Sequence, residues 1–173
     1  IRLKQVSYSE IGIMNQNQIC IDGVYATTCV FREGFRAQKN PFFSELQFKH
    51  SKGDVLDLVI DDLDSDTIYH HGKWLCPISK GRFRYGASAT WDINDPNQYN
   101  EEECKKLNRS FNDWLSVDYE LKSPLVGVRS TLKDFNALIQ YHQTEPFILM
   151  NGLGGHGTVL APVLSRLLLD TYM

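Results

Sequence analysis

Residues 147–162 read Phe-Ile-Leu-Met-Asn-Gly-Leu-Gly-Gly-His-Gly-Thr-Val-Leu-Ala-Pro, and this stretch is the most informative in the chain. Its four leading apolar residues predict a buried strand, and the glycines of 152–157 predict a loop almost without side chains. A helix is expected from Thr158 to near Met173. Glycines let a backbone approach a ligand closely, and the N–H groups at a helix start favour acceptors and negative charge. The stretch is therefore typical of a cofactor site.

The overall composition is that of an ordinary globular protein. The chain has 173 residues, 42% of them apolar and 23% charged, which is enough for one substantial core that two subdomains can share. The net charge of −3 gives no reason to expect a nucleic-acid or membrane partner. No apolar run is long enough to span a bilayer, and there is no signal-peptide pattern. We therefore expect a cytoplasmic protein.

The cysteines and histidines do not form a pattern that binds metal. The cysteines are widely spaced without a C-x-x-C pair, so we expect reduced thiols, and no metal site is predicted from the histidine spacing. The residues concerned are Cys20, Cys29, Cys76, Cys104, His50, His70, His71, His142 and His156. An acidic cluster over 61–66 lacks the glycine and terminal glutamate of an EF-hand, and we interpret it as a solvated turn.

Short alternating or β-branched runs predict strands along most of the chain. Asp22-Gly23 separates two of them and is typical of a type I′ hairpin. Asn100 followed by Glu101–Glu103 predicts the start of a helix over 100–115, with Glu103 completing a capping box. The expected fold class is α+β with a largely antiparallel sheet. The predicted strands are 3–8, 19–21, 24–25, 27–31, 55–60, 67–71, 73–76, 82–87, 119–122, 126–131 and 147–150.

The terminal helix is expected to bury one apolar stripe at helical spacing. The stripe consists of Leu160, Val163, Leu164, Leu167 and Leu168.

Arg129 is the most specific candidate for a ligand-binding residue in the sequence. It lies near the end of a predicted strand among small and apolar neighbours, where a guanidinium can hold a carboxylate through two parallel hydrogen bonds. An ion pair with one of the chain's own carboxylates explains the same position equally well.

Tyr85 is a second candidate for ligand binding, because its hydroxyl can form a hydrogen bond with a ligand in a pocket lined by Trp74 or Trp91. An ordinary half-buried sheet aromatic is the alternative for Tyr85.

The sequence offers no catalytic side chain. No Ser-His-Asp, Cys-His or paired-carboxylate set emerges, and Glu101–Glu103 are better explained as helix-start charges than as a general acid pair. His156 is unusual within the glycine loop, and a solvent-facing loop residue is the simplest interpretation of it. Without a protein nucleophile or a metal, any chemistry has to be carried by an organic cofactor.

Several motifs together resemble the FAD-dependent amine oxidases, the family of D-amino acid, glycine and sarcosine oxidases. The segments 126–134 (Val-Gly-Val-Arg-Ser-Thr-Leu-Lys-Asp) and 151–157 (Asn-Gly-Leu-Gly-Gly-His-Gly), with Leu160-Ala161-Pro162, resemble the C-terminal signature of this family. The segments 52–56, 82–90 and 29–34 resemble its internal strands. The resemblance covers almost the whole chain.

The resemblance implies a two-part fold and an FAD cofactor. We expect 1–36 to be part of an FAD-binding α/β domain, 37–125 to be an antiparallel substrate domain, and 126–173 to return to the FAD-binding domain. Arg129 then holds the substrate carboxylate, and hydride passes from a small amine or amino acid to the flavin. Tyr85 stays the second substrate-binding candidate, on the residues alone. The implied cofactor-binding residues are Gly152, Gly154, Gly155, His156, Gly157 and Thr158.

The chain departs from the family pattern in several respects. Ser130 replaces the usual proline after the arginine, and 137–140 reads Ala-Leu-Ile-Gln where Pro-Leu-Ile-Gly is usual. No cysteine neighbours Arg129, so a covalent flavin link is not supported. There is also no N-terminal G-x-G-x-x-G fingerprint after a strand. We therefore expect the C-terminal portion of an enzyme, whose partner is the missing N-terminal half.

Two other functions remain open from the sequence. Related flavin domains act on an aminomethyl-uridine of tRNA, although the acidic charge balance weighs against nucleic acid. The second alternative is that the chain is a non-catalytic fragment that binds no flavin on its own. Such a fragment is also expected to expose apolar surface, which favours self-association into a homo-oligomer.

Overall fold

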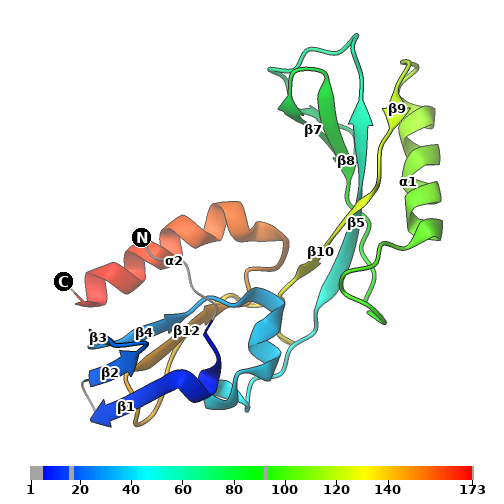
Figure 1. Cartoon of the computed structure of the whole chain (residues 1–173). Helices are drawn as coiled ribbons and strands as arrows, with labels where there is room; N and C mark the ends of the chain where they lie inside the picture. The colour runs from blue at the N-terminus through cyan, green and yellow to red at the C-terminus, as the bar shows by residue number, and fades with distance from the viewer. Residues whose placement is uncertain (1–5, 16–17, 92, 173) are drawn as a thin grey trace. The chain divides into compact units, whose positions relative to one another are not determined.

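The computed structural model describes residues 6–15, 18–91 and 93–172 (Figure 1). The chain divides into two compact units, one made of residues 1–50 and 129–173 and the other of residues 51–128. The sequence predicted domain boundaries after residues 36 and 125, whereas these compact units divide after residues 50 and 128. The mixed α+β fold class is confirmed.

The first unit contains two three-stranded sheets, with strand orders β1-β2-β3 and β11-β12-β4. In the second of these sheets, β12 lies between an antiparallel β11 and a parallel β4. The predicted turn at Asp22-Gly23 is confirmed, since both residues have positive φ, 53° and 74°. The strands are β1 (Ile11–Asn15), β2 (Gln18–Ile21), β3 (Val24–Ala26), β4 (Cys29–Phe31), β11 (Leu138–Tyr141) and β12 (Phe147–Asn151).

One apolar core holds the first unit together. Every residue of β12 is buried, as the apolar run predicted, and its Phe147 and Leu149 pack with Phe31 of β4. The remaining members of this core are Ile19, Ala37 and Phe43. The helical elements of the unit are the 3₁₀ turns Tyr8–Glu10, Gly34–Lys39, Pro41–Phe43 and Gly154–His156, and the helix α2 (Gly157–Tyr172).

The second unit is an antiparallel sheet packed against helix α1 (Glu101–Trp114). The strand order is β10-β5-β8-β7-β6, and β9 also pairs with β5. Side chains on one face of the sheet, among them Leu58 and Phe83, are fully buried against α1, which contributes the fully buried Phe111. The strands are β5 (Ser51–Val59), β6 (Tyr69–His70), β7 (Trp74–Ser79), β8 (Arg82–Gly86), β9 (Glu120–Leu121) and β10 (Leu125–Arg129), the last residue of which belongs to the first unit.

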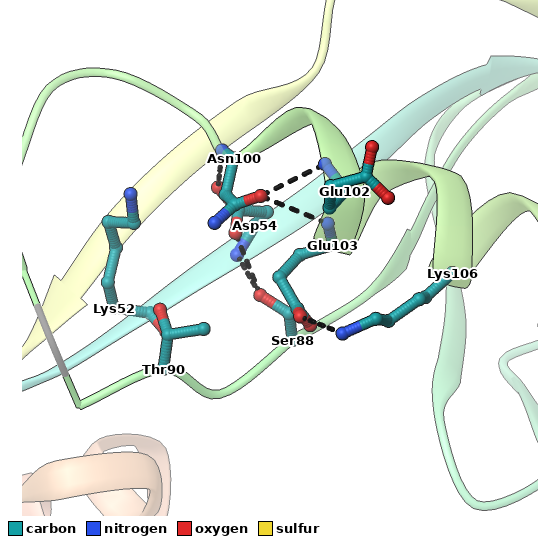
Figure 2. A network of polar contacts seen from close by, with 8 residues as sticks. All are labelled: Lys52, Asp54, Ser88, Thr90, Asn100, Glu102, Glu103 and Lys106. Atoms are coloured by element: carbon teal, nitrogen blue, oxygen red, sulfur yellow. Dashed lines mark hydrogen bonds and ion pairs between the residues drawn. The ribbon is translucent and has the colours of Figure 1, made fainter.

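Helix α1 begins where the sequence predicted, at the cap Asn100. The Asn100 Oδ1 accepts hydrogen bonds from the backbone N–H groups of Glu102 and Glu103, at 2.9 and 3.2 Å. The Glu103 carboxylate pairs with Lys106 at 2.6 Å, and the Asn100 N–H instead donates to Oδ1 of Asp54 at 3.0 Å (Figure 2). The buried Asp54 thus takes the part expected of Glu103 in a capping box and ties the helix start to β5.

Replacing the cap should weaken the second unit. The variant Asn100→Ala leaves the N–H groups of Glu102 and Glu103 without their acceptor, so we expect a loss of about 1 kcal/mol in the free energy of unfolding, measured by urea denaturation. The exposed Asn97, whose side chain makes no cap, is the matched control, and Asn97→Ala should leave stability unchanged. Equal losses in the two variants would contradict the capping role.

Two sequence predictions of structure need correction. The expected strand at 3–8 lies partly outside the described residues, and its last residue, Tyr8, begins a 3₁₀ turn. The stripe of α2 is only partly covered: Leu160, Leu164 and Leu168 are half-buried, whereas Val163 and Leu167 are each 55% exposed. Sequence periodicity identifies the apolar face of a helix but does not supply the surface that covers it.

Candidate cofactor and substrate site

The glycine-rich segment 152–157 links β12 to α2 in the first unit. It begins with Gly152, continues as a 3₁₀ turn over Gly154–His156, and passes directly into α2 at Gly157, one residue before the predicted start. Gly155, His156 and Thr158 are exposed to solvent, while Gly154 and Gly157 are partly covered. The backbone at this helix start is therefore accessible to a ligand, which is the arrangement that favours binding of acceptor groups.

Only glycine fits at the first position of this loop. Gly152 has φ +77°, and a Cβ atom placed on it would lie 2.5 Å from the carbonyl oxygen of Asn136 and 3.2 Å from a methyl carbon of Leu132. Gly154 also has positive φ, +54°, and faces Thr131 at an ordinary contact distance. The loop thus packs closely onto segment 130–136, and side chains are excluded from that contact.

Asn151, the last residue of β12, fixes the start of the loop through its side chain. Its Oδ1 accepts a hydrogen bond from the Gly152 N–H at 2.8 Å, and its Nδ2 donates to the carbonyl oxygen of Gly34 at 2.9 Å. Because Asn151 is 3% exposed, these two bonds are shielded from water. The amide therefore connects the glycine loop to the segment that follows β4.

The glycine loop and the Arg129 motif meet at Ser130. The N–H of Gly154 donates to the carbonyl oxygen of Ser130 at 2.8 Å, and Ser130 directly follows Arg129 at the end of β10. Arg129 is half-buried. Two motifs that lie more than twenty residues apart in the sequence are thus adjacent within one unit.

The segment that follows Ser130 forms a short antiparallel pairing with residues 47–49. Phe48 and Leu132 form a bridge, the Lys49 N–H donates to the Thr131 carbonyl at 2.8 Å, and the Lys133 N–H donates to the Gln47 carbonyl at 2.9 Å. The backbone of segment 131–133 is thus held against that of segment 47–49.

His50 and Ser130 both bury polar atoms without a hydrogen bond. Among the residues that the structure describes, neither ring nitrogen of His50 has a hydrogen-bond partner, and neither does the Ser130 hydroxyl. The imidazole instead stacks on Phe48, with ring centroids 5.1 Å apart, and meets the edge of Phe35 at 6.2 Å. Most buried polar groups have a hydrogen-bond partner, because leaving one without a partner costs the desolvation of the group.

Burial of His50 should make stability depend on pH. Desolvation lowers the pKa of His50 below its ordinary value of 6.5. Near neutral pH the imidazole of His50 is mostly neutral in both the folded and the unfolded protein. As pH falls through 6.5 the unfolded state takes up a proton that the folded state resists, so the free energy of unfolding should decrease on acidification.

The variant His50→Phe should show a weaker decrease, because it removes the titrating group and keeps the ring contacts. Urea denaturation at about pH 7 and about pH 5 measures the difference, with the exposed His70→Phe as control. A pH dependence that is unaltered in His50→Phe would contradict this assignment.

The second predicted substrate residue, Tyr85, lies in the core of the second unit. Its side chain is fully buried, its hydroxyl pairs with the Ser110 hydroxyl at 2.9 Å, and its ring packs edge-on against Phe111 at 5.2 Å. These contacts favour the alternative of a packing residue. The strand alternation that the sequence predicted is confirmed, since Phe83 is buried beside Tyr85 while Arg82 and Arg84 are exposed.

Sequence reasoning missed three residues of this region. Asn151 was within the motif but carried no predicted role, and His50 and Ser130 had no pattern that connected them. An asparagine directly before a loop glycine is a usable local signal, because the Asn side chain readily bonds the backbone that follows. The pairing of segment 47–49 with segment 131–133 depends on contacts between distant parts of the chain and has no local signal.

Two general properties complete the description. Within residues 6–15, 18–91 and 93–172, no helix is long and apolar enough to cross a membrane. In the same described part of the chain, no three or more His, Cys, Asp or Glu side chains gather where they could hold a metal ion.

Comparison with known proteins identifies the family. Residues 34–171 match the family model described as FAD dependent oxidoreductase. The fold is similar to those of glycine oxidase from Geobacillus kaustophilus (18% identity, TM-score 0.70, 93% of this chain and 46% of that chain) and of glycine oxidase from Bacillus cereus (14%, 0.69, 92% and 49%). It is also similar to that of iminodiacetate oxidase from Chelativorans sp. BNC1 (13%, 0.69, 88% and 46%).

The chain spans about half the length of these solved structures. At such low identity the similarity shows the fold, whereas the match to the family model covers most of the chain and establishes the relationship. The family inferred from the sequence is confirmed, and with it FAD as the family's cofactor. The chain belongs to the family of FAD dependent oxidoreductases.

Proposed function

We propose that the complete protein containing this chain oxidises a small amine or amino acid, passing a hydride from the substrate's α-carbon to FAD. The observation that carries this proposal is the contact between Gly154 and Ser130, which brings the glycine loop next to the Arg129 motif. A flat, hydrogen-bonding cofactor and a carboxylate-binding arginine on adjacent segments are what such a reaction requires.

The residues of the first unit fit a flavin. Gly152 and Gly154 keep the loop free of side chains, and Gly155, His156 and Thr158 leave an accessible helix start. The N–H groups of a helix start suit the carbonyl oxygens on the polar edge of a flavin ring. The FAD would supply the hydride acceptor, which no protein side chain provides.

The protein's own contribution is positioning. The guanidinium of Arg129 is proposed to hold the substrate carboxylate through two parallel hydrogen bonds, which fixes the α-carbon relative to the glycine loop. When the α-carbon loses a hydride and the amine nitrogen loses a proton, the substrate becomes an imine. Water then hydrolyses the imine to a carbonyl compound and a free amine.

We also propose that a nucleotide-binding part of the flavin fold packs on the first unit. Strand β4 is an edge strand beside β12 in the described part of the chain, and it runs parallel to β12, as strands of a nucleotide-binding domain do. The apolar side chains of α2 that remain uncovered are Val159, Val163, Leu167 and Leu169. A partner domain would bury these surfaces.

The partner proposal predicts weak flavin binding by the chain alone. Purified as the 173 residues given, it should retain little FAD, because the contacts to the pyrophosphate and adenosine are supplied elsewhere. Visible absorption of the purified chain after incubation with FAD and desalting measures this. A yellow chain with stoichiometric flavin would contradict the proposed division of the site.

Oxidation itself is tested with the complete, FAD-loaded protein under anaerobic conditions. Mixing with glycine, N-methylglycine or alanine should bleach the flavin absorption with at least one of them, and an oxo acid and an amine should form in equal amounts. If a chemical reductant bleaches the flavin but no amine or amino acid does, the proposed function is wrong.

A further inference from the structure

Asn151 is the only asparagine of the chain that is followed directly by a glycine. In such a pair the backbone nitrogen of the glycine can attack the side-chain carbonyl carbon of the asparagine, because glycine has no side chain that hinders the approach. A bond forms between the Gly152 nitrogen and Cγ of Asn151, the bond from Cγ to Nδ2 breaks, and the nitrogen's proton leaves with the departing ammonia. Water then opens the succinimide ring to aspartate or isoaspartate.

The folded structure uses both ends of this amide. The Asn151 Oδ1 accepts a hydrogen bond from the Gly152 N–H at 2.8 Å, and Nδ2 donates to the Gly34 carbonyl oxygen at 2.9 Å. An ionised carboxylate has only acceptors. Deamidation therefore removes the donor from the Gly34 carbonyl and places a negatively charged oxygen in its stead, at a position shielded from water. The connection between the glycine loop and the segment that follows β4 is then lost.

The same contacts suppress the reaction while the loop is closed. The Gly152 N–H points at Oδ1, so the nitrogen is not directed at Cγ, and Asn151 is only 3% exposed. Gly152 is itself buried and is fixed at φ +77° close to the Asn136 carbonyl oxygen. The attack thus requires that the end of β12 and the start of the loop leave this arrangement together.

The segment on the other side of the loop is held much less firmly than β12. Gly155 and His156 are exposed, and α2 leaves Val159 69% and Val163 55% exposed. Segments with few buried apolar contacts open at a low cost in free energy. A reactive amide at the end of a fully buried strand therefore adjoins a loop and helix that can open locally.

We propose that Asn151 is a modification site, at which deamidation disconnects the glycine loop from the segment that follows β4, and that FAD bound at the loop suppresses this modification. The inference rests on the proposed contact between the glycine loop and the flavin. A ligand that binds only the closed loop lowers the population of the open form. Protein that has lost its flavin is then modified faster, and the modified protein binds FAD more weakly.

The rate of deamidation tests the proposal in the wild-type complete protein. Samples with and without FAD are kept at mildly alkaline pH, and mass spectrometry of the peptide that contains Asn151 follows conversion of the amide to the acid. FAD at about ten times its Kd should slow the conversion about 10-fold. The urea-unfolded protein gives the intrinsic rate and should react fastest. Equal rates with and without FAD, or no conversion in the FAD-free protein, would overturn the proposal.

The variant Asn151→Asp reproduces the modified side chain. Hydrogen exchange of the peptide that contains the loop should become faster, and Kd for FAD should rise about 10-fold, because a buried hydrogen bond is lost and a charge is added. Gln38→Glu is the matched control, since it makes the same amide-to-acid change at an exposed position of the turn Gly34–Lys39. It should change neither quantity. If Asn151→Asp does not fold, the deamidated wild-type protein, separated by its charge, replaces it in both measurements.

The outcomes separate this inference from the proposed oxidation, because neither measurement uses a substrate. Unchanged exchange in Asn151→Asp overturns the role of Asn151. Faster exchange with an unchanged Kd for FAD contradicts the contact between loop and flavin, and with it the protection by FAD. If no amine bleaches the flavin while FAD still slows deamidation and Asn151→Asp still weakens FAD binding, the oxidation proposal fails and the modification site stands.

Discussion

Replacing Arg129 by alanine in the complete protein should raise KM for every carboxylate-bearing substrate and leave flavin content unchanged. Loss of a charge-assisted pair with the substrate costs about 2–5 kcal/mol, which corresponds to a fall in kcat/KM of roughly 30-fold or more. The effect should be specific to the carboxylate, because Arg129 is proposed to bind that group alone. Steady-state kinetics with an amino acid and with the corresponding amine lacking the carboxylate measure it.

Arg36→Ala is the control for this variant. Arg36 is an exposed arginine of the same unit, so its removal makes the same change in charge without touching the proposed carboxylate contact. Kinetics of Arg36→Ala should match those of the wild-type protein. An unchanged KM for all acidic substrates in Arg129→Ala would eliminate Arg129 as the carboxylate-binding residue.

The second large effect is expected at Gly152. Alanine at this position must adopt φ +77° with its Cβ 2.5 Å from the Asn136 carbonyl oxygen, which is closer than such atoms normally approach. The left-handed conformation costs about 1–2 kcal/mol, and relief of the overlap about 1–3 kcal/mol more. We expect Gly152→Ala to lose about 2–5 kcal/mol in the free energy of unfolding, measured by urea denaturation.

A neighbouring glycine provides the control within the same loop. Gly155 has no neighbouring atom within 4 Å of a built Cβ and no positive φ. Gly155→Ala should therefore leave stability unchanged or raise it by up to about 1 kcal/mol, because the unfolded chain loses freedom. Equal destabilisation by both substitutions would show that the loop tolerates no side chain anywhere, rather than being packed at Gly152 alone.

Local chemistry explains which parts of the fold could be predicted. The hairpin at Asp22-Gly23 and the cap at Asn100 depend on residues within a few positions of each other, and both are confirmed. The buried strand 147–150 has a continuous apolar signal and is central in its sheet. The glycine loop also follows from local composition, and its start differs from the prediction by one residue.

Features that depend on contacts between distant segments could not be predicted from local sequence. The N–H of Asn100 at the start of α1 donates to Asp54 of β5, whereas the sequence predicted that Glu103 would accept this hydrogen bond. The apolar stripe of α2 is partly exposed at Val163. Helical periodicity predicts which face of a helix is apolar, but it does not predict which surface covers that face. Segments 47–49 and 131–133, which precede His50 and follow Ser130, pair although they lie more than 80 residues apart in the sequence. The roles of Arg129 and the glycines in binding stay predictions.

The most direct test of the central claim asks whether Arg129 and the flavin share one site. A non-oxidisable carboxylate such as acetate, titrated into the complete FAD-loaded protein, should shift the flavin absorption spectrum, because a carboxylate held by Arg129 lies beside a ring held by the glycine loop. In Arg129→Ala the shift should vanish at the same acetate concentrations while the flavin stays bound. A shift of equal size and affinity in the two proteins would contradict the account, as would the absence of any shift in the wild-type protein.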